Sequence, residues 1–294
     1  MAGRFAPSPT SDLHLGNLRT ALVAWLLARG SGRAFRLRIE DLDTTRVAAA
    51  GDVARRQLAD IAALGLDTDG EVVWQSRRLD AYATAVAGLE TYPCYCTRRE
   101  IAEAASAPHG DGHRPYPGTC LRLSASRRAE LAATRRPALR VRAGGASWTV
   151  HDVWAGEVTG VVDDFVLVRN DGVPAYNLAV VVDDLAMAVD QVCRGDDLLS
   201  SSPRQAWLAV RLGGEPPAYA HVPLAVNSEG RRLAKRDGAV TMADLAARGV
   251  TAGQVLTRLA ASLGLAAQDE PVTPAELLRR FDPAALPREP WVVA

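Results

Sequence analysis

The sequence predicts an α/β fold, with an open sheet covered by helices, a cysteine-bearing insert and a small helical region at the C-terminal end. Three observations support this prediction. A strand, a turn and a helix open the chain, strand-like runs return from residue 165 onward, and short helical patterns occupy residues 241–294. The sequence contains no Gly-x-Gly-x-x-Gly motif after a strand, which argues against a dinucleotide-dependent oxidoreductase.

The opening unit places polar residues at the start of a helix. Residues 4–10 run from an apolar start into two prolines, which cannot continue a strand, and a helix is expected over residues 18–29. His14, Gly16 and Asn17 lie just before it. A helix start offers unpaired N–H groups and a positive dipole end, so we expect these three residues to bind phosphate. The alternative is a capped helix that follows a loop.

The next strand is expected over residues 35–39 and ends in the acidic residues Glu40, Asp41 and Asp43. Ligands of open α/β sheets bind outside the carboxyl ends of the strands, so these carboxylates are expected at the site. A surface cluster or a helix cap is the alternative. Two amphipathic helices are expected to follow and to cover the sheet, over residues 48–65 and 79–89.

Three cysteines indicate a metal site. Cys94 and Cys96 are one residue apart and Cys120 adds a third thiol, whereas structural zinc requires four ligands. The loop between them offers four further candidates: His109, Asp111, His113 and Tyr116. The ligand chemistry favours His113, because phenolate is an uncommon ligand. Three unrelated thiols are the alternative, and Cys193, in an apolar run, is expected in the core.

The second half of the chain is expected to return to strands. Residues 165–168 and 178–182 are predicted as strands on either side of a turn at residues 170–172, and Tyr176 would begin the second strand. Another strand is expected over residues 189–194. Ser201-Ser202-Pro203 then predicts a helix start, with a polar cap followed by proline.

A second polar loop follows a strand-like run over residues 222–226. It contains Lys235, the only lysine among the 34 basic residues of the chain. An ammonium group on a flexible stem can follow a phosphate through a reaction, so we expect Lys235 to contact one. The alternative is a chance survivor in an arginine-rich composition.

Composition narrows the class of protein. The formal net charge is zero and 48% of the residues are hydrophobic, which excludes a basic nucleic-acid coat and predicts a globular protein. We find no charged-then-apolar leader and no run of eighteen apolar residues, so we expect a cytoplasmic protein without membrane contact, whose cysteines are thiols or metal ligands. Arginine pairs make residues 98–142 locally basic, and this segment is a candidate RNA-facing surface.

Together these motifs resemble the class I aminoacyl-tRNA synthetases, whose paired motifs are called HIGH and KMSKS. The resemblance is strongest to the glutamyl branch and rests on residues 4–10, 14–17, 38–43, 164–184, 194–199 and 232–238. It implies a Rossmann-like catalytic domain in two halves, residues 1–92 and 150–240. It also implies a zinc-binding, acceptor-type insert over residues 93–149 and a helical region over residues 241–294. A full glutamyl-tRNA synthetase continues into anticodon-binding domains, so the chain most resembles the truncated glutamyl-queuosine tRNA(Asp) synthetases.

The resemblance also implies an activity and its residues. L-Glutamate would be activated by ATP with Mg²⁺ and transferred to the queuosine base of tRNA(Asp), by a monomeric enzyme. The glutamate-binding residues would be Arg4, Phe5, Ala6, Pro7, Ser8, Glu40, Tyr176 and Arg194. The ATP-binding residues would be His14, Gly16, Asn17 and Lys235, of which His14 and Lys235 would also be catalytic. The zinc ligands would be Cys94, Cys96, Tyr116 and Cys120.

Arg194 is chemically suited to its implied role, because a guanidinium binds a carboxylate with two parallel hydrogen bonds. Arg232 and Ala234 depart from the usual KMSKS pattern, in which a lysine and a serine stand at these positions. Three alternative functions stay open: ordinary aminoacylation of a tRNA 3′ end, an adenylyltransferase acting on another acid, and a non-enzymatic RNA-binding remnant.

Overall fold

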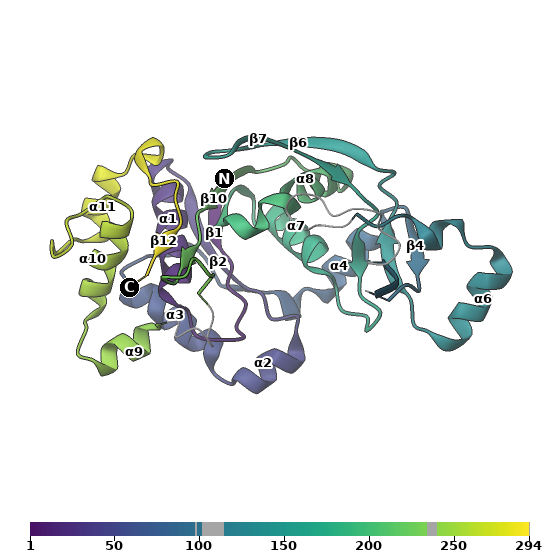
Figure 1. Cartoon of the computed structure of the whole chain (residues 1–294), viewed down its shortest axis with the longest axis horizontal. Helices are drawn as coiled ribbons and strands as arrows, with labels where there is room; N and C mark the ends of the chain where they lie inside the picture. The colour runs from purple at the N-terminus through teal and green to yellow at the C-terminus, as the bar shows by residue number, and fades with distance from the viewer. Residues whose placement is uncertain (98, 102–114, 234–239, 294) are drawn as a thin grey trace.

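The computed structural model describes residues 1–97, 99–101, 115–233 and 240–293 (Figure 1). The α-helices are α1 (Leu15–Gly30), α2 (Thr44–Ala50), α3 (Val53–Ala63), α4 (Leu79–Ala87), α6 (Ala125–Thr134), α7 (Tyr176–Ala186), α8 (Ser202–Arg211), α9 (Met242–Ala247), α10 (Ala252–Ser262) and α11 (Pro274–Arg280). The strands are β1 (Ala2–Phe5), β2 (Ala34–Ile39), β3 (Val73–Trp74), β4 (Thr91–Cys94), β5 (Ala138–Val141), β6 (Ala146–Asp152), β7 (Gly156–Val162), β8 (Val166–Val168), β9 (Val189–Gly195), β10 (Ala218–Val222), β11 (Ala225–Val226) and β12 (Trp291–Val292). Short 3₁₀ turns are η1 (Gln75–Arg77), η2 (Thr119–Arg122), η3 (Asp196–Ser201) and η5 (Pro283–Ala285).

The main sheet has seven strands in the order β3-β2-β1-β9-β10-β6-β7. All neighbours are parallel except β6 and β7, which form an antiparallel hairpin. From β1 the strand order runs outward in both directions, through β2 on one side and through β9 on the other. This arrangement makes β1 and β9 the point where the strand order reverses, and open α/β sheets bind ligands at the carboxyl ends of such strands.

Helices cover both faces of this sheet. One face buries Phe5, Phe35 and Cys193 against α1, which in turn contacts α10 and α11. The opposite face packs against α7 and α8, which contact each other, and α8 also contacts β6 and β7. Figure 1 shows α10 and α11 beside α1 at one end of the molecule, with α9 below them near α3, and α6 at the other end. The α/β prediction is confirmed.

A smaller antiparallel sheet, β4-β5-β8, lies apart from the main sheet. Its own buried cluster is small and consists of Tyr92, Cys94, Tyr95, Tyr116 and Cys120. Beyond the main sheet, β12 pairs in parallel with β11 and so attaches the C-terminal end to the chain that follows β10.

Most predicted elements are present, but one predicted strand is wrong. Residues 178–182 belong to helix α7, which begins at Tyr176. The turn at residues 170–172 is present, with Gly172 at φ 87° and its N–H donating to the carbonyl of Arg169. A short, fully apolar run has the same pattern in a buried strand and in a buried helix, and here α7 is buried beneath α8.

Three further differences are local. The helix predicted over residues 48–65 is divided into α2 and α3 at Gly51, whose φ is 63°. The run predicted over residues 222–226 is divided between β10 and β11. Helix α8 begins with Pro203 in its first turn, as predicted, but Ser201 makes no side-chain capping bond.

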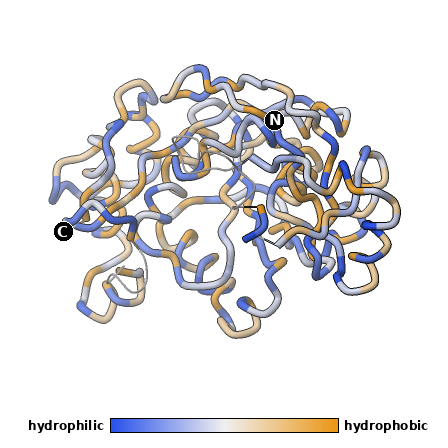
Figure 2. Tube along the Cα trace, turned by 45° about the vertical axis from the view of Figure 1, so that its right-hand side comes forward, coloured by the Kyte–Doolittle hydropathy of each residue, from blue (hydrophilic) through white to orange (hydrophobic). Residues whose placement is uncertain are grey.

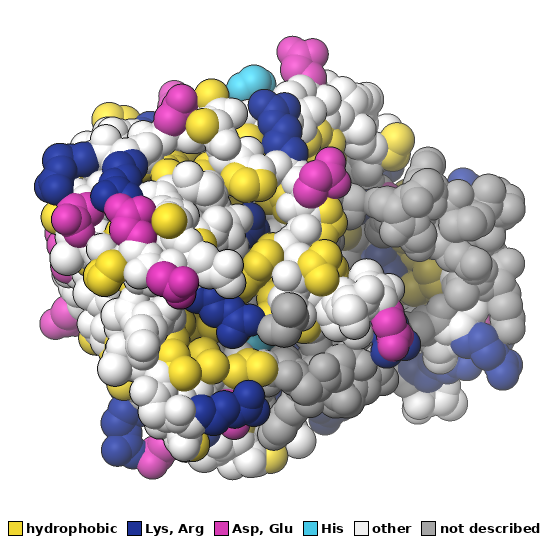
Figure 3. Space-filling model, turned by 60° about the vertical axis from the view of Figure 1, so that its left-hand side comes forward, with side chains coloured by type: hydrophobic (Ala, Val, Ile, Leu, Met, Phe, Trp, Pro, Cys, Tyr) yellow, Lys and Arg dark blue, Asp and Glu magenta, His cyan; other side chains and the backbone are white. Residues whose placement is uncertain are grey.

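Hydrophilic and hydrophobic residues are interleaved along the whole trace (Figure 2). Among the described helices, none combines the length and apolar character needed to span a bilayer. On the face shown in Figure 3, positive and negative side chains are mixed with hydrophobic ones. This distribution agrees with a formal net charge of zero.

Candidate functional site

A cavity of about 760 Å³ opens at the carboxyl ends of β1 and β9. It brings together nearly all residues implied for glutamate and ATP, namely Arg4, Phe5, Ala6, Pro7, Ser8, His14, Gly16, Asn17, Glu40, Tyr176 and Arg194. Lys235 lies outside the described residues. Arg232 and Leu233, which precede it, line the same cavity. Arg232 and Leu233 of the second half thus share the cavity with the start of α1.

Among the described residues that line this cavity, Arg194 is the cation without an anionic partner. It is buried, with 6% of its surface exposed. Its Nη1 donates to Gln205 Oε1 at 2.7 Å and lies 3.5 Å from the Tyr176 hydroxyl. Its Nη2 donates to Ser202 Oγ at 2.8 Å and to the Leu198 carbonyl at 3.2 Å. No carboxylate among the described residues forms an ion pair with Arg194, so a carboxylate ligand would supply its missing counter-charge.

The other arginines at the strand ends have carboxylate partners. Arg4 Nε donates to Asp184 Oδ1 at 3.3 Å, and Arg4 Nη1 donates to the Cys193 carbonyl at 3.0 Å. Arg38 is fully buried and donates to the same Asp184 oxygen at 2.5 Å. Arg38 Nη2 also donates to Glu40 Oε1 at 3.0 Å. The contact with Asp184 leaves Arg4 less available to a ligand than Arg194.

Glu40 is held at the cavity wall by Arg38. Burial raises the pKa of Glu40, although Arg38 opposes this effect. Asp41 and Asp43 do not line the cavity. Asp41 accepts hydrogen bonds from the backbone and hydroxyl of Ser76, and Asp43 caps α2. Asp43 is therefore a helix cap and Asp41 a buried acceptor for Ser76, and Glu40 is the member of the group that faces the site.

The start of α1 differs from the expected phosphate cradle. The Gly16 and Asn17 N–H groups donate to His14 Nδ1 at 3.1 and 3.3 Å, and the Leu15 N–H donates to the Val240 carbonyl. Unpaired backbone donors are thus absent at these three positions. Gly16 also has a packing role, because a Cβ there would lie 2.8 Å from Ala225 Cβ.

This capping arrangement instead determines which ring nitrogen of His14 carries the proton. Since Nδ1 accepts two hydrogen bonds, the proton of the neutral ring is on Nε2, where it can be donated to a ligand. Burial, with a further contribution from Arg232, lowers the pKa of His14 to about 4. Its side chain is therefore a neutral donor near pH 7.

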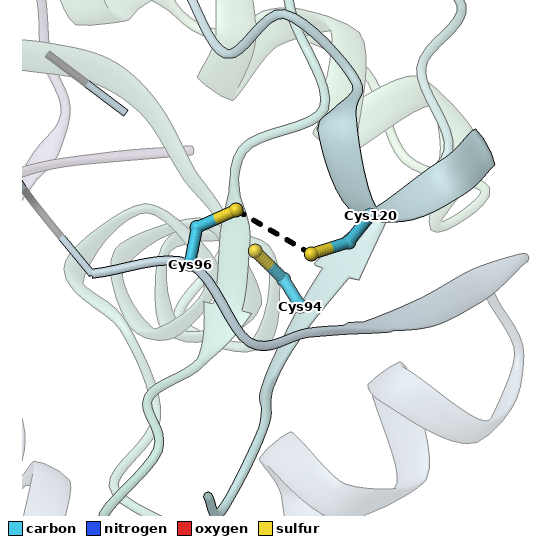
Figure 4. A group of neighbouring side chains, drawn as sticks. All are labelled: Cys94, Cys96 and Cys120. Carbon is cyan, nitrogen blue, oxygen red and sulfur yellow. Dashed lines mark hydrogen bonds between the residues drawn. The ribbon is translucent and has the colours of Figure 1, made fainter. Parts of the chain in front are cut away.

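The three predicted cysteines converge (Figure 4). Their sulfur atoms all lie within 4.8 Å of one another, and Cys96 and Cys120 are 3.4 Å apart. The Tyr116 hydroxyl lies 3.5 Å from Cys94 Sγ and 3.7 Å from Cys96 Sγ. Zn–S bonds of about 2.3 Å in a tetrahedron place sulfur atoms about 3.8 Å apart, so the donor set fits zinc. His113, the other candidate ligand, lies outside the described residues.

Burial raises the pKa of the Cys96 thiol to about 12. Ligation by the Cys96 thiolate at neutral pH therefore requires the charge of a bound cation. The cluster connects the small sheet to the 3₁₀ turn η2, since Cys94 ends β4 and Cys120 lies in η2. A metal here would cross-link a segment whose own apolar cluster is small.

The basic run at residues 98–142 is only partly available to a nucleic acid. Arg140 is buried, with its guanidinium 3.6 Å from the centre of the Tyr116 ring. Arg127, Arg135 and Arg142 are exposed, and they pair with nearby glutamates. Cys193 is buried in the core, as expected.

The sequence did not indicate a role for the buried residues that contact the site residues or their direct partners: Arg38, Asp152, Asp183, Gln205 and His221. Each lies in a helix or strand and is buried. For His221, its place between Ala220 and Val222 in an apolar run is the signal that could have identified it.

Comparisons with known proteins agree with this geometry. A model of the family "tRNA synthetases class I (E and Q), catalytic domain" matches residues 1–293. The glutamyl-Q tRNA(Asp) synthetase of Nocardia farcinica is 59% identical over 99% of this chain and 93% of its own length. That of Cutibacterium acnes is 56% identical over 97% and 85%. The crystal structure of glutamate-tRNA synthetase from Elizabethkingia anophelis aligns with a TM-score of 0.81 at 27% identity, over 99% of this chain and 67% of that chain.

Proposed function

This chain belongs to the class I tRNA synthetases of the glutamyl and glutaminyl branch and, within it, to the glutamyl-Q tRNA(Asp) synthetases; we propose that it activates L-glutamate with ATP and transfers the glutamate to the queuosine base of tRNA(Asp). The observation that carries the proposal is Arg194, a buried guanidinium with no anionic partner in the part of the chain that the structure describes, in a cavity that also contains Glu40. An amino acid with an acidic side chain supplies the missing charge.

The two charged groups define how glutamate would bind. Arg194 receives the side-chain carboxylate through a charge-assisted hydrogen bond from Nη1, in place of the long contact with Tyr176. Glu40, oriented by Arg38, receives the α-ammonium. The backbone from Phe5 to Ser8 forms the adjacent wall of the cavity.

Activation requires positioning and charge stabilisation rather than a protein nucleophile. An oxygen of the glutamate α-carboxylate attacks the α-phosphorus of ATP, the bond from that phosphorus to the bridging oxygen breaks, and pyrophosphate leaves. His14 donates its Nε2 proton to a phosphate oxygen as a hydrogen bond. We assign to Lys235 the neutralisation of charge on the departing pyrophosphate, with Mg²⁺ as the accompanying cation.

The second step uses the adenylate. A hydroxyl of the queuosine base attacks the activated carbonyl carbon, AMP leaves, and an ester remains on the tRNA. We assign a zinc site to Cys94, Cys96, Tyr116 and Cys120 in the insert over residues 93–149, where the ion is structural. Bound there, the metal would hold β4 and η2 together.

The test is incubation with radiolabelled glutamate, ATP, Mg²⁺ and total tRNA from cells with and without queuosine. Label is expected on tRNA(Asp) only in the queuosine-containing sample. Equal labelling of both samples would instead indicate aminoacylation of a 3′ end.

Two carboxylate variants give a matched comparison. Glu40→Gln removes the partner of the ammonium group and should abolish most labelling. Asp43→Asn alters the cap of α2 outside the cavity and should leave labelling near the wild-type level.

A further inference from the structure

Behind Arg194 lies a histidine to which the catalytic scheme above gives no role. His221 is on β10, directly opposite Arg194 of the neighbouring β9. Its side chain is 1% exposed. Arg194 Nε donates to His221 Nε2 at 3.0 Å, and His221 Nδ1 lies 2.7 Å from Asp152 Oδ2. An imidazole ring thus separates the guanidinium from Asp152, which is itself fully buried.

These contacts fix the tautomer of His221. Arg194 Nε can only donate a hydrogen bond, so His221 Nε2 must accept and carries no proton. The Asp152 carboxylate can only accept, so the proton is on Nδ1. Burial lowers the pKa of His221, although Asp152 opposes this effect, and the ring is neutral near pH 7.

Asp152 is held as the ionised acceptor that this tautomer requires. It also accepts hydrogen bonds from the backbone N–H groups of Trp154, Ala155 and His221, between 2.8 and 3.0 Å. Burial alone would raise its pKa, but the hydrogen bonds from His221 and this backbone lower it overall.

Ser202, His221 and Asp152 could be mistaken for a hydrolytic triad, since Ser202 Oγ lies 3.4 Å from His221 Nε2. The general base of such a triad would be His221 Nε2, but this nitrogen already accepts a hydrogen bond from Arg194 Nε. Ser202 is completely buried and accepts a hydrogen bond from Arg194 Nη2. A substrate cannot reach this hydroxyl, so the network serves Arg194 rather than a nucleophile.

We propose that His221 is a positioning and specificity-determining residue, which orients Arg194 toward the cavity and keeps Asp152 from pairing with it. The positive charge of Arg194 is then available for an acidic side chain of the substrate. A carboxylate in direct contact with Arg194 would compete with that substrate group and would favour a neutral amide instead. This inference rests on the proposed function, since it assigns the preference for glutamate over glutamine to His221 and Asp152, which lie behind Arg194.

Three variants separate orientation from charge. His221→Leu removes the acceptor for Arg194 Nε. His221→Gln restores a neutral acceptor through its amide oxygen. His221→Glu places a carboxylate against Arg194. His151→Gln is the matched control, because His151 is exposed on β6 next to Asp152.

The assay is ATP–pyrophosphate exchange with total tRNA present, measured at varied glutamate, glutamine and ATP. His221→Leu should raise the KM for glutamate at least about tenfold, the effect of losing a hydrogen bond to a charged group, with kcat and the KM for ATP within about threefold. His221→Gln should recover most of that loss. His221→Glu should lower the ratio of kcat/KM for glutamate over glutamine at least about tenfold, because it neutralises Arg194.

The outcomes are distinguishable. An unchanged KM for glutamate in His221→Leu, or equal impairment of His221→Leu and His221→Gln, overturns the inference. A parallel loss of kcat and of ATP binding in both variants also overturns it, because it indicates a merely structural role. Thermal unfolding of each variant identifies any that fails to fold. In that case the test rests on His221→Gln, the variant closest to histidine in shape and polarity, and on its ratio of kcat/KM for glutamate over glutamine. Exchange by the wild-type protein that does not depend on glutamate would refute the proposed function itself.

Discussion

Replacing Arg38 by methionine should destabilise the protein strongly. Arg38 is fully buried and is the shared partner of Asp184 and Glu40, while its Nε lies 3.8 Å from Asp183. Methionine fills a similar volume but leaves these carboxylates without their common counter-charge. Removing one partner from a buried ion pair costs about 3–5 kcal/mol, and we expect a loss in this range in the free energy of unfolding.

The assay is urea unfolding followed by tryptophan fluorescence. Arg33→Met is the matched control, because Arg33 makes a comparable ion pair with Asp190 at 2.8 Å but in a partly exposed position. Pairs of that kind contribute about 0–1 kcal/mol, so the control should shift the midpoint little. Equal shifts of the urea midpoint for the two variants would refute the assignment of Arg38 as the shared counter-charge of these buried carboxylates.

The pH dependence gives a second check with a definite sign. Burial raises the pKa of Asp184, but Arg38 and Arg4 outweigh it and hold that pKa below its ordinary value. In the wild-type protein this stabilisation is present above the unfolded pKa and is lost as the pH falls through the folded pKa. Without Arg38 the carboxylate pKa values rise, so protonation relieves the penalty. The difference in stability between wild type and Arg38→Met should therefore shrink as the pH falls from 8 to 5.

Three further predictions concern the loop, the metal and the start of α1. Lys235→Ala should reduce glutamyl-adenylate formation roughly a hundredfold, as loss of a transition-state charge donor does, whereas Arg231→Ala at an exposed position should not; pyrophosphate exchange measures both. Cys96→Ser should lower bound zinc from about one ion per chain to well below one by atomic absorption, and wild-type zinc content in that variant would contradict the ligand assignment. Gly16→Ala should destabilise the protein by about 1–3 kcal/mol through the contact with Ala225, and an unchanged urea midpoint would contradict this packing role.

Local patterns predicted much of the molecule. The strand, turn and helix at the N-terminal end, the spacing of Cys94, Cys96 and Cys120, and the acidic end of β2 are all properties of short segments. Because the carboxyl ends of neighbouring parallel strands meet at one edge of a sheet, such segments also indicated which residues share a cavity.

The remaining features depend on partners far apart in the sequence. Residues 178–182 carry the apolar pattern of a strand, and only their packing beneath α8 shows a helix. His221 and Asp152 are 69 residues apart and meet through the pairing of β10 with β6. The start of α1 matched a phosphate-binding pattern, but the sequence could not show that His14 itself accepts from the Gly16 and Asn17 N–H groups.

The most direct test of the account is the dependence of pyrophosphate exchange on glutamate in Arg194→Met. We expect kcat/KM for glutamate to fall about thirtyfold or more, since truncating one partner of a buried charge pair costs about 2–5 kcal/mol, while the KM for ATP stays within about threefold. The variant should lose about 1–3 kcal/mol of stability, because Gln205 and His221 lose their buried donor, so exchange is measured well below its unfolding midpoint. An unchanged dependence on glutamate would contradict the claim that this guanidinium binds the acidic side chain.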